Sequence, residues 1–321
     1  MSYPELSEVK RVAIIGAGVI GGGWAAHFLR QGLDVTAWDP APGGGEKLRA
    51  FVAQVWPTML KMGLKPGADP ARLTLAPDLA AAVRDAQFVQ ENAPERLDLK
   101  RDVLAQIDAA APAGIIISSS TSGFSMTDMA VNARHHPERL VVGHPFNPPY
   151  LIPLVEVVGG VQTDPAAVDW AVAFQNHFGK YGLKMTKELP GFLGNRLQDA
   201  VWRESLHMVA AGEATVEEID ASIVQGPGLR WALMGVNLTF HLAGGEGGMA
   251  HMLDHFGPSL KEPWTRLEAP ELTQALRDRV VAGCDRAAAG RSVAELIQER
   301  DEFLVDLLAV LEKHWAKWGK R

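Results

Sequence analysis

The chain has 321 residues, of which 47% are hydrophobic and 21% are charged. This length favours two folded domains, and this composition excludes a fibrous repeat or a long disordered tract. The formal net charge of −7 argues against partners such as nucleic acid or an anionic membrane, because both require a basic surface on the protein.

Two further features bear on the compartment. The single cysteine, Cys284, has no second cysteine for an internal disulfide, which favours a reducing environment. Residues 1–10 are polar and do not lead into an apolar signal core, and the apolar run at residues 12–26 is too short to span a bilayer. We therefore expect a cytoplasmic protein.

In the first half of the chain, short apolar runs alternate with helical patterns. This alternation predicts an α/β fold with a Rossmann-type, doubly wound parallel sheet. Helical spacing is clear at residues 22–30 and 46–62. The expected strands are residues 12–16, 34–38, 88–91, 115–118, 140–143 and 154–158.

The pattern changes after Pro190-Gly191, where strand-like runs end and long amphipathic helical patterns begin. We expect an NAD-binding domain over residues 1–189 and an all-α domain over residues 190–321. Thr215 and Glu218 have the spacing of a capping box. The expected helices of the second domain are residues 192–211, 215–223, 271–289 and 292–315.

The first site motif is Gly16-Ala-Gly18-Val-Ile-Gly21, between an expected strand and an expected helix. The first glycine of such a motif permits a tight turn, the second lets a pyrophosphate approach the backbone, and the third allows close helix packing. A glycine-rich turn in an unrelated sheet protein is the alternative. The expected dinucleotide contacts are Gly16, Gly18, Val19, Ile20 and Gly21.

Asp39 ends the next expected strand, about 20 residues further on. A carboxylate at this place binds the ribose hydroxyls of the adenosine. The same charge repels the 2′-phosphate of NADP, so we expect the cofactor to be NAD.

The second motif, His144-Pro-Phe-Asn147-Pro, follows the expected strand at residues 140–143, where open sheets bind ligands. Imidazole is suited to taking a proton from an alcohol near neutral pH. Glu156 lies in the apolar run at residues 154–158, and a carboxylate there needs a partner to offset its desolvation. We pair it with His144. The spacing also fits a core histidine and an outward glutamate that never meet.

The third motif, Pro190-Gly-Phe192-Leu-Gly-Asn195-Arg196, opens the long helix at the expected domain boundary. The amide of Asn195 is a candidate to hydrogen-bond a substrate oxygen. An asparagine that caps or bridges backbone is the alternative.

In this order, the three motifs resemble the L-3-hydroxyacyl-CoA dehydrogenase superfamily, and the resemblance covers nearly the whole chain. It implies catalytic roles for His144 and Glu156, substrate binding by Asn195, and a homodimer formed through the helical domain. A serine near the nicotinamide aligns with Thr121, and Ser122 is adjacent, so the choice between these hydroxyls stays open. Further cofactor contacts carry over to Glu95, Lys100 and Asn147.

Within the superfamily, residues 226–235, 242–249 and 255–265 most resemble the members that oxidise L-carnitine. The trimethylammonium group of L-carnitine would bind aromatic faces through cation–π attraction. Core packing is the alternative for each aromatic candidate, and Arg196 and Arg230 are unranked candidates to bind the carboxylate. The aromatic candidates are Phe146, Phe192, Trp231, Phe240 and Trp264.

Other readings stay open at this point. Another member of the superfamily would oxidise a 3-hydroxyacyl-CoA or L-gulonate. A protein of a different class would keep the fold and bind a nucleotide without catalysis, as related lens crystallins do. His251, Asp254 and His255 lie within one helical turn of each other, but no credible third ligand accompanies the histidines, so we expect no metal site.

Overall fold

The structure is a computed structural model that describes residues 3–256, 258, 265, 271 and 273–318. The chain divides into two compact units, Met1–Asn195 and Arg196–Arg321.

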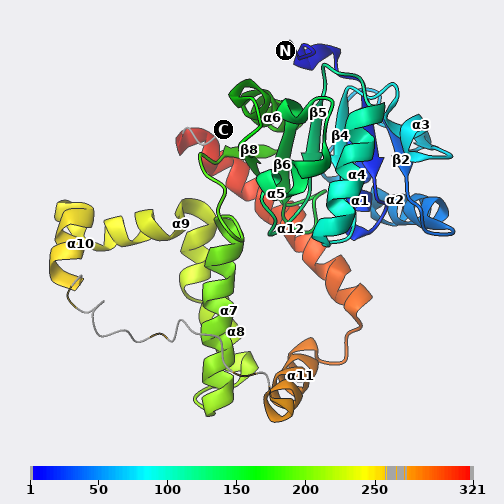
Figure 1. Ribbon diagram of the computed structural model, residues 1–321. Coiled ribbons are helices and arrows are strands. Elements are labelled where there is room, and N and C mark those ends of the chain that lie inside the picture. Colours follow the sequence, from blue (N-terminus) through cyan, green and yellow to red (C-terminus); the bar gives the residue numbers. More distant parts are fainter. Residues whose placement is uncertain (1–2, 257, 259–264, 266–270, 272, 319–321) are drawn as a thin grey trace. The chain divides into compact units, whose positions relative to one another are not determined.

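The first unit is built on an eight-stranded sheet with the order β3-β2-β1-β4-β5-β6-β7-β8 (Figure 1). Neighbouring strands are parallel except for the pair β6 and β7. The predicted α/β fold with a doubly wound sheet is confirmed. The strands are β1 (Arg11–Ile15), β2 (Asp34–Trp38), β3 (Leu73–Leu75), β4 (Phe88–Glu91), β5 (Ile116–Ser119), β6 (Leu140–Pro145), β7 (Leu154–Gly159) and β8 (Tyr181–Lys184).

The sheet differs from the sequence prediction in three respects. Strands β3 and β8 were not predicted, because β3 has only three residues and β8 lacks a buried apolar run. Strand β7, expected to be parallel, runs antiparallel to β6. The reason is the connection at residues 146–153, which is too short for the crossover that parallel neighbours require.

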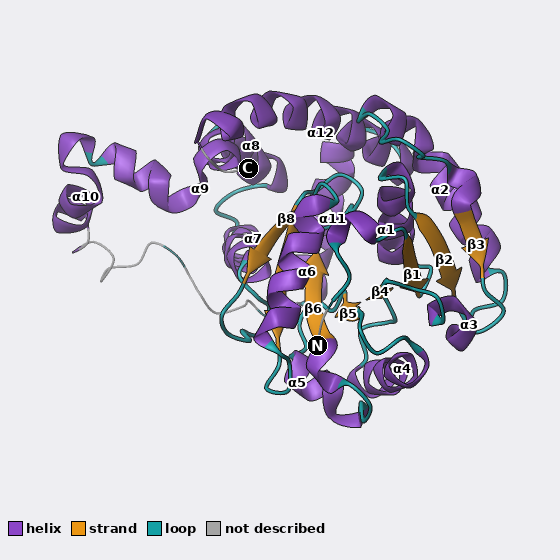
Figure 2. Cartoon of the chain, turned by 90° about the horizontal axis from the view of Figure 1, so that it is seen from above, coloured by secondary structure: helices purple, strands orange, loops and turns teal. Residues whose placement is uncertain are grey.

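Helices cover both faces of the sheet (Figure 2). On one face, α1 (Val19–Arg30) and α6 (Pro165–His177) meet over an aromatic cluster in which the rings of Phe88 and Phe174 stack 4.0 Å apart. Helix α2 (Gly44–Lys61) packs on α1. On the other face, α3 (Leu79–Val83), α4 (Leu97–Ala110) and α5 (Met126–Met129) enclose the aliphatic core. This packing fixes the strand ends that carry the site.

The second unit is helical in its described part. A small core of Val209, Ile219 and Leu276 joins three of its helices. The predicted capping box of Thr215 and Glu218 is confirmed at the start of α8. No described helix of the chain is both long and apolar enough for a membrane span. The helices are α7 (Gly194–Ala211), α8 (Val216–Val224), α9 (Pro227–Ala243), α10 (Gly248–Phe256), α11 (Gln274–Ala288) and α12 (Val293–Trp315).

His27 in α1 predicts a pH dependence of stability. Its ring is buried and hydrogen-bonded to Phe178 O over 2.9 Å. Burial, and then the charges of Lys180 and Arg30, hold the pKa of His27 well below 6.5. Below about pH 6.5, His27 is therefore protonated in the unfolded chain but stays neutral in the folded chain. The free energy of unfolding consequently decreases as the pH falls.

This loss should reach at most about 1.4 kcal/mol per pH unit from His27 alone. The variant His27→Gln retains a side-chain donor for the carbonyl and does not titrate, so urea unfolding between pH 7 and pH 5 should give a shallower dependence than the wild type. Equal slopes for the two proteins would contradict this assignment.

Candidate active site

The glycine motif forms the turn between β1 and α1, and two of its glycines are required sterically. Gly16 has a φ of +89°, and a Cβ there would lie 2.6 Å from Asn92 O. A Cβ on Gly21 would lie 1.9 Å from Gly16 O. A larger residue at position 16 would therefore clash with the loop after β4, and one at position 21 would push α1 away from the turn.

Gly18 has a different environment. A Cβ there would meet no atom within 4 Å, and no side chain caps α1 at this residue. The first N–H groups of α1, at Val19 and Ile20, have no acceptor within the helix, and a helix N-terminus favours an anion. A pyrophosphate fits this place.

Asp39 follows β2 and is fixed by the backbone. Its Oδ2 accepts from Ala17 N over 2.6 Å, and its Oδ1 accepts from Ala41 N over 2.8 Å. A carboxylate oxygen has two lone pairs, so both oxygens retain capacity for ribose hydroxyls. With the open turn at Gly18, these residues fit a dinucleotide such as NAD.

His144 and Glu156 are direct partners across β6 and β7. They occupy opposite positions in the antiparallel ladder, which places their side chains on the same face of the sheet. Nδ1 of His144 and Oε2 of Glu156 are 2.9 Å apart, and the two residues are only 4% and 0% exposed. Gly143 precedes the histidine because a Cβ there would lie 2.3 Å from Ser118 Oγ.

Glu156 also holds the start of α7. Its Oε1 accepts from Leu193 N and Gly194 N, each over 2.9 Å. Burial acts to raise the pKa of Glu156, but hydrogen bonds from His144 and from these two amides outweigh it and lower the pKa. The ionised carboxylate therefore accepts from Nδ1–H, which leaves the lone pair of Nε2 free for a proton.

Two phenylalanines flank the imidazole. The ring centroids of Phe146 and Phe192 lie 5.0 Å and 5.2 Å from that of His144. Phe192 has a φ of +53° and is 1% exposed, so it forms a buried wall beside the imidazole. Phe146 is half-buried and lies against Gly194.

Thr121 and Ser122 lie in the loop after β5, where Glu95 binds both. Oε1 of Glu95 accepts from Thr121 Oγ1 over 2.6 Å, from Ser122 N over 2.9 Å and from Gly123 N over 3.1 Å. Thr121 is fully buried, whereas Ser122 is exposed. Lys100 is 1% exposed and contacts Glu95 from below the loop over 3.5 Å.

Asn195 joins this loop to α7, because its Nδ2 donates to Ser122 O over 3.1 Å. Asn147 is exposed in the loop after β6. The first unit thus gathers the histidine, the glutamate, the asparagine and the two hydroxyls around the ends of β4, β5, β6 and β7. Arg196, Arg230, Trp231 and Phe240 belong to the second unit, and Trp264 lies outside the described residues.

Sequence reasoning missed one group at this site. Glu91, at the end of β4, is fully buried and binds both Lys100 and Ser119. The signal that identified Glu156, a carboxylate within an apolar strand, is also present in Phe88-Val-Gln-Glu91. The backbone donors at Leu193 and Gly194 carry no sequence signal.

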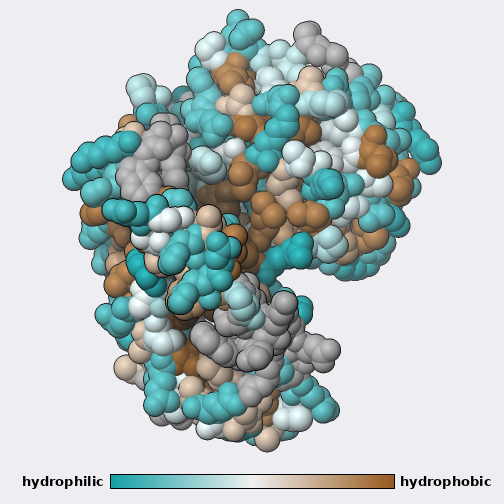
Figure 3. Space-filling view, turned by 90° about the vertical axis from the view of Figure 1, so that its left-hand side faces the viewer, coloured by the Kyte–Doolittle hydropathy of each residue, from teal (hydrophilic) through white to brown (hydrophobic). Residues whose placement is uncertain are grey.

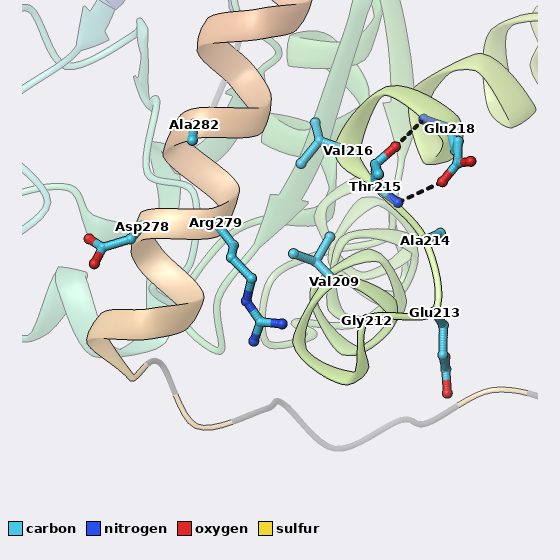
Figure 4. Close-up of a pocket in the computed structure, with 10 residues that line it drawn as sticks. All are labelled: Val209, Gly212, Glu213, Ala214, Thr215, Val216, Glu218, Asp278, Arg279 and Ala282. Atoms are coloured by element: carbon cyan, nitrogen blue, oxygen red, sulfur yellow. Dashed lines mark hydrogen bonds between the residues drawn. The ribbon is translucent and has the colours of Figure 1, made fainter.

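The described residues contain no group of three or more His, Cys, Asp or Glu side chains arranged to hold a metal ion. A pocket of about 470 Å³ lies within the second unit, between the α7–α8 turn and α11 (Figure 4). None of the predicted site residues lines it. Arg279 at its wall donates to Ala210 O over 3.0 Å, and the Thr215–Glu218 capping box lies at its edge.

Comparisons with known proteins identify relatives along the whole chain. The family model for the 3-hydroxyacyl-CoA dehydrogenase NAD binding domain matches residues 11–189, and that for the 3-hydroxyacyl-CoA dehydrogenase C-terminal domain matches residues 191–282. L-carnitine dehydrogenase of Streptomyces griseus is 67% identical over 94% of this chain and 90% of its own length. L-carnitine dehydrogenase of Pseudomonas putida is 50% identical over 98% of each protein.

Solved structures agree with this family. An NAD⁺-dependent dismutase, 5-formyl-3-hydroxy-2-methylpyridine 4-carboxylic acid 5-dehydrogenase, has a TM-score of 0.81 at 26% identity, covering 95% of this chain and 99% of its own. The (S)-3-hydroxybutyryl-CoA dehydrogenase of Ralstonia eutropha has a TM-score of 0.62 at 27% identity, covering 86% and 95%.

The lowered pKa of Glu156 predicts how its replacement acts. The variant Glu156→Gln should lower the free energy of unfolding at pH 7 by about 2 kcal/mol, because buried donors lose a charged acceptor. A carboxylate with a lowered pKa stabilises the fold above its unfolded pKa, near 4.5, and this contribution is lost as the pH falls through the folded value. The difference between variant and wild type in urea unfolding should therefore shrink below about pH 4.5. A difference in the free energy of unfolding that stays constant down to pH 3.5 would contradict the lowered pKa of Glu156.

Proposed function

Because the chain belongs to the 3-hydroxyacyl-CoA dehydrogenase family, we propose that this NAD-dependent dehydrogenase oxidises the 3-hydroxyl group of L-carnitine to a ketone, with His144 as the base. The observation that carries the chemistry is the buried 2.9 Å contact between His144 Nδ1 and Glu156 Oε2, in the same sheet whose first strand leads into the glycine turn. The proposal that L-carnitine is the substrate rests on relatives named L-carnitine dehydrogenase, which are 50–67% identical over most of the chain.

The proposed base acts through its free nitrogen. Glu156 accepts from Nδ1 of His144, so Nε2 takes the hydroxyl proton of the substrate while the hydrogen on C3 leaves as hydride. Bound NAD supplies the hydride acceptor. Glu156 then stabilises the imidazolium, which bears a positive charge in a buried place.

Two further groups are placed to hold the substrate oxygen. Asn195 uses one N–H for Ser122 O, which leaves its second N–H for a ligand. Thr121 Oγ1 donates to Glu95 over 2.6 Å and accepts from Phe124 N over 3.1 Å, whereas the hydroxyl of the exposed Ser122 makes a longer contact of 3.4 Å with Glu95. We therefore assign the substrate contact to Ser122 and a loop-holding role to Thr121.

The half-buried ring of Phe146 is the aromatic surface of the first unit that best suits the trimethylammonium group. Its centroid is 5.0 Å from that of the imidazole, so a substrate of the size of L-carnitine reaches both groups. Phe192 is too deeply buried for this contact. Trp231 and Arg196 belong to the second unit, and Trp264 lies outside the described residues.

A direct assay tests the function. NADH formation should be much faster with L-carnitine than with 3-hydroxybutyryl-CoA or L-gulonate, each measured with the same enzyme. The variant His144→Gln should lower turnover of L-carnitine roughly 100-fold or more, with NADH affinity nearly unchanged, because only proton transfer is removed. A wild-type enzyme that is inactive on L-carnitine would refute the assignment of L-carnitine as the substrate. Unchanged turnover in His144→Gln would refute the assignment of His144 as the base.

The second unit supports a homodimer. Most of the large hydrophobic side chains that are exposed in the described chain belong to it. On the face shown in Figure 3, hydrophobic residues are scattered among hydrophilic ones. Phe303 and Val310, seven residues apart on one side of α12, are 62% and 53% exposed. Such surfaces usually bind another protein, and a second copy of the chain is the partner we propose.

Light scattering on the purified protein should give about twice the mass of one chain. The double variant Phe303→Asp with Val310→Asp should shift the mass towards that of one chain, because it places charges in an apolar interface. The control is Val161→Asp, at an 81% exposed position in the first unit, which should not change the mass. A wild-type protein with the mass of one chain rules the homodimer out.

A further inference from the structure

A buried polar network lies under the loop that carries Ser122, at the carboxyl ends of β4 and β5. Glu91 and Ser119 are 0% exposed, and Lys100 of α4 is 1% exposed. An ionised group so deeply buried must be balanced by partners, because transfer out of water strongly disfavours its charge. The partners of Glu91 therefore indicate which neighbouring groups its negative charge holds in place.

Glu91 accepts four hydrogen bonds from three donor groups. Its Oε1 accepts from Ala93 N over 2.5 Å and from Lys100 Nζ over 3.0 Å. Its Oε2 accepts from Ser119 Oγ over 2.5 Å and from the same Nζ over 3.2 Å. Lys100 also donates to Ala93 O over 3.0 Å. The ammonium group is therefore held inside the protein and does not reach solvent.

The same ammonium reaches Glu95. Lys100 Nζ lies 3.5 Å from Glu95 Oε2, and the other oxygen of Glu95 receives the donors of Thr121, Ser122 and Gly123. Lys100 thus stands between two carboxylates. If Glu91 lost its charge, the ammonium would be balanced by Glu95 alone and would draw that carboxylate away from the loop.

The path continues to the histidine. Asn195 donates to Ser122 O, and the helix that carries Asn195 begins at Gly194, whose N–H donates to Glu156. Glu156 is the partner of His144. Two ion pairs of Lys100, followed by hydrogen bonds linked through the backbone of Ser122 and of residues 194–195, therefore connect Glu91 to the proposed base, all within the first unit.

We infer that Glu91 is a positioning residue for the NAD-binding site: it holds Lys100 so that Glu95 keeps the loop at residues 121–123 in the conformation that receives the cofactor. Its effect on L-carnitine oxidation rests on the proposed function. Its effect on cofactor binding does not.

The test measures the Kd of NADH by fluorescence titration of the full chain. The variant Glu91→Gln keeps the size of the side chain and removes its charge, and it should raise the Kd roughly tenfold or more, because a charged hydrogen-bond network is broken. In the background of Glu95→Gln, the same change should raise the Kd less than roughly twofold, since Glu95 transmits the effect.

Asp108→Asn is the matched control. Asp108 lies on the same helix as Lys100, is 2% exposed and pairs with the buried Arg139 over 3.0 Å. The variant Asp108→Asn should lower the unfolding midpoint as Glu91→Gln does. It should change the Kd of NADH less than roughly twofold, because the Asp108–Arg139 pair does not belong to the series of contacts that connects Glu91 with Ser122. Equal Kd increases for the two variants, or an effect of Glu91→Gln that persists with Glu95→Gln, would overturn the inference.

If Glu91→Gln does not fold, Ser119→Ala replaces it in the same titration. This variant removes one donor of Glu91, and also the acceptor of Thr121 N over 3.3 Å, without removing a charge. It should raise the Kd of NADH roughly threefold, and less than roughly twofold in the background of Glu95→Gln, where only a direct effect on Thr121 would persist. An unchanged Kd would overturn the inference. A wild-type enzyme that binds NADH but does not oxidise L-carnitine would refute the proposed substrate and leave the role of Glu91 standing.

Discussion

The antiparallel pairing of β6 and β7 is the constraint on which the proposed site depends. It brings His144 and Glu156 opposite each other, although twelve residues separate them along the chain. A carboxylate without solvent contact needs several donors, and Glu156 obtains them from the imidazole and from the first amides of α7. One buried charge thus orients the base and fixes the helix that carries Asn195.

Glu91, at the end of β4, has a similar set of buried partners between β4 and β5. Each of the two carboxylates ends a buried strand or lies within one, and each binds one cationic or protonatable side chain together with a backbone donor from a loop. The strands are packed on both faces, whereas Ala93 is only partly buried and Leu193 is exposed in the loops. The two buried carboxylates therefore hold the backbone of these loops to the sheet through hydrogen bonds.

The sequence predicted the parts of the site whose chemistry is local. The glycine turn depends on spacings of a few residues and Asp39 follows at the end of the next strand, so a single sequence displays both. The Thr215 capping box, outside the site, was predicted on the same kind of local spacing. Strand β8, with Tyr181 and Lys184 exposed, does not have the apolar pattern of a strand. The antiparallel direction of β7 and the donors of Glu156 and Glu91 depend on tertiary packing, so residue type alone does not reveal them.

The tautomer of His144 tests the central claim most directly. In a ¹⁵N-histidine spectrum of the protein, the His144 signals are those that vanish in His144→Gln, among the ten histidines of the chain. With Glu156 ionised, we expect the neutral ring to carry its proton on Nδ1 and to leave Nε2 unprotonated. A neutral ring with its proton on Nε2 would contradict the proposed pairing, because that nitrogen could not then accept a proton from an alcohol.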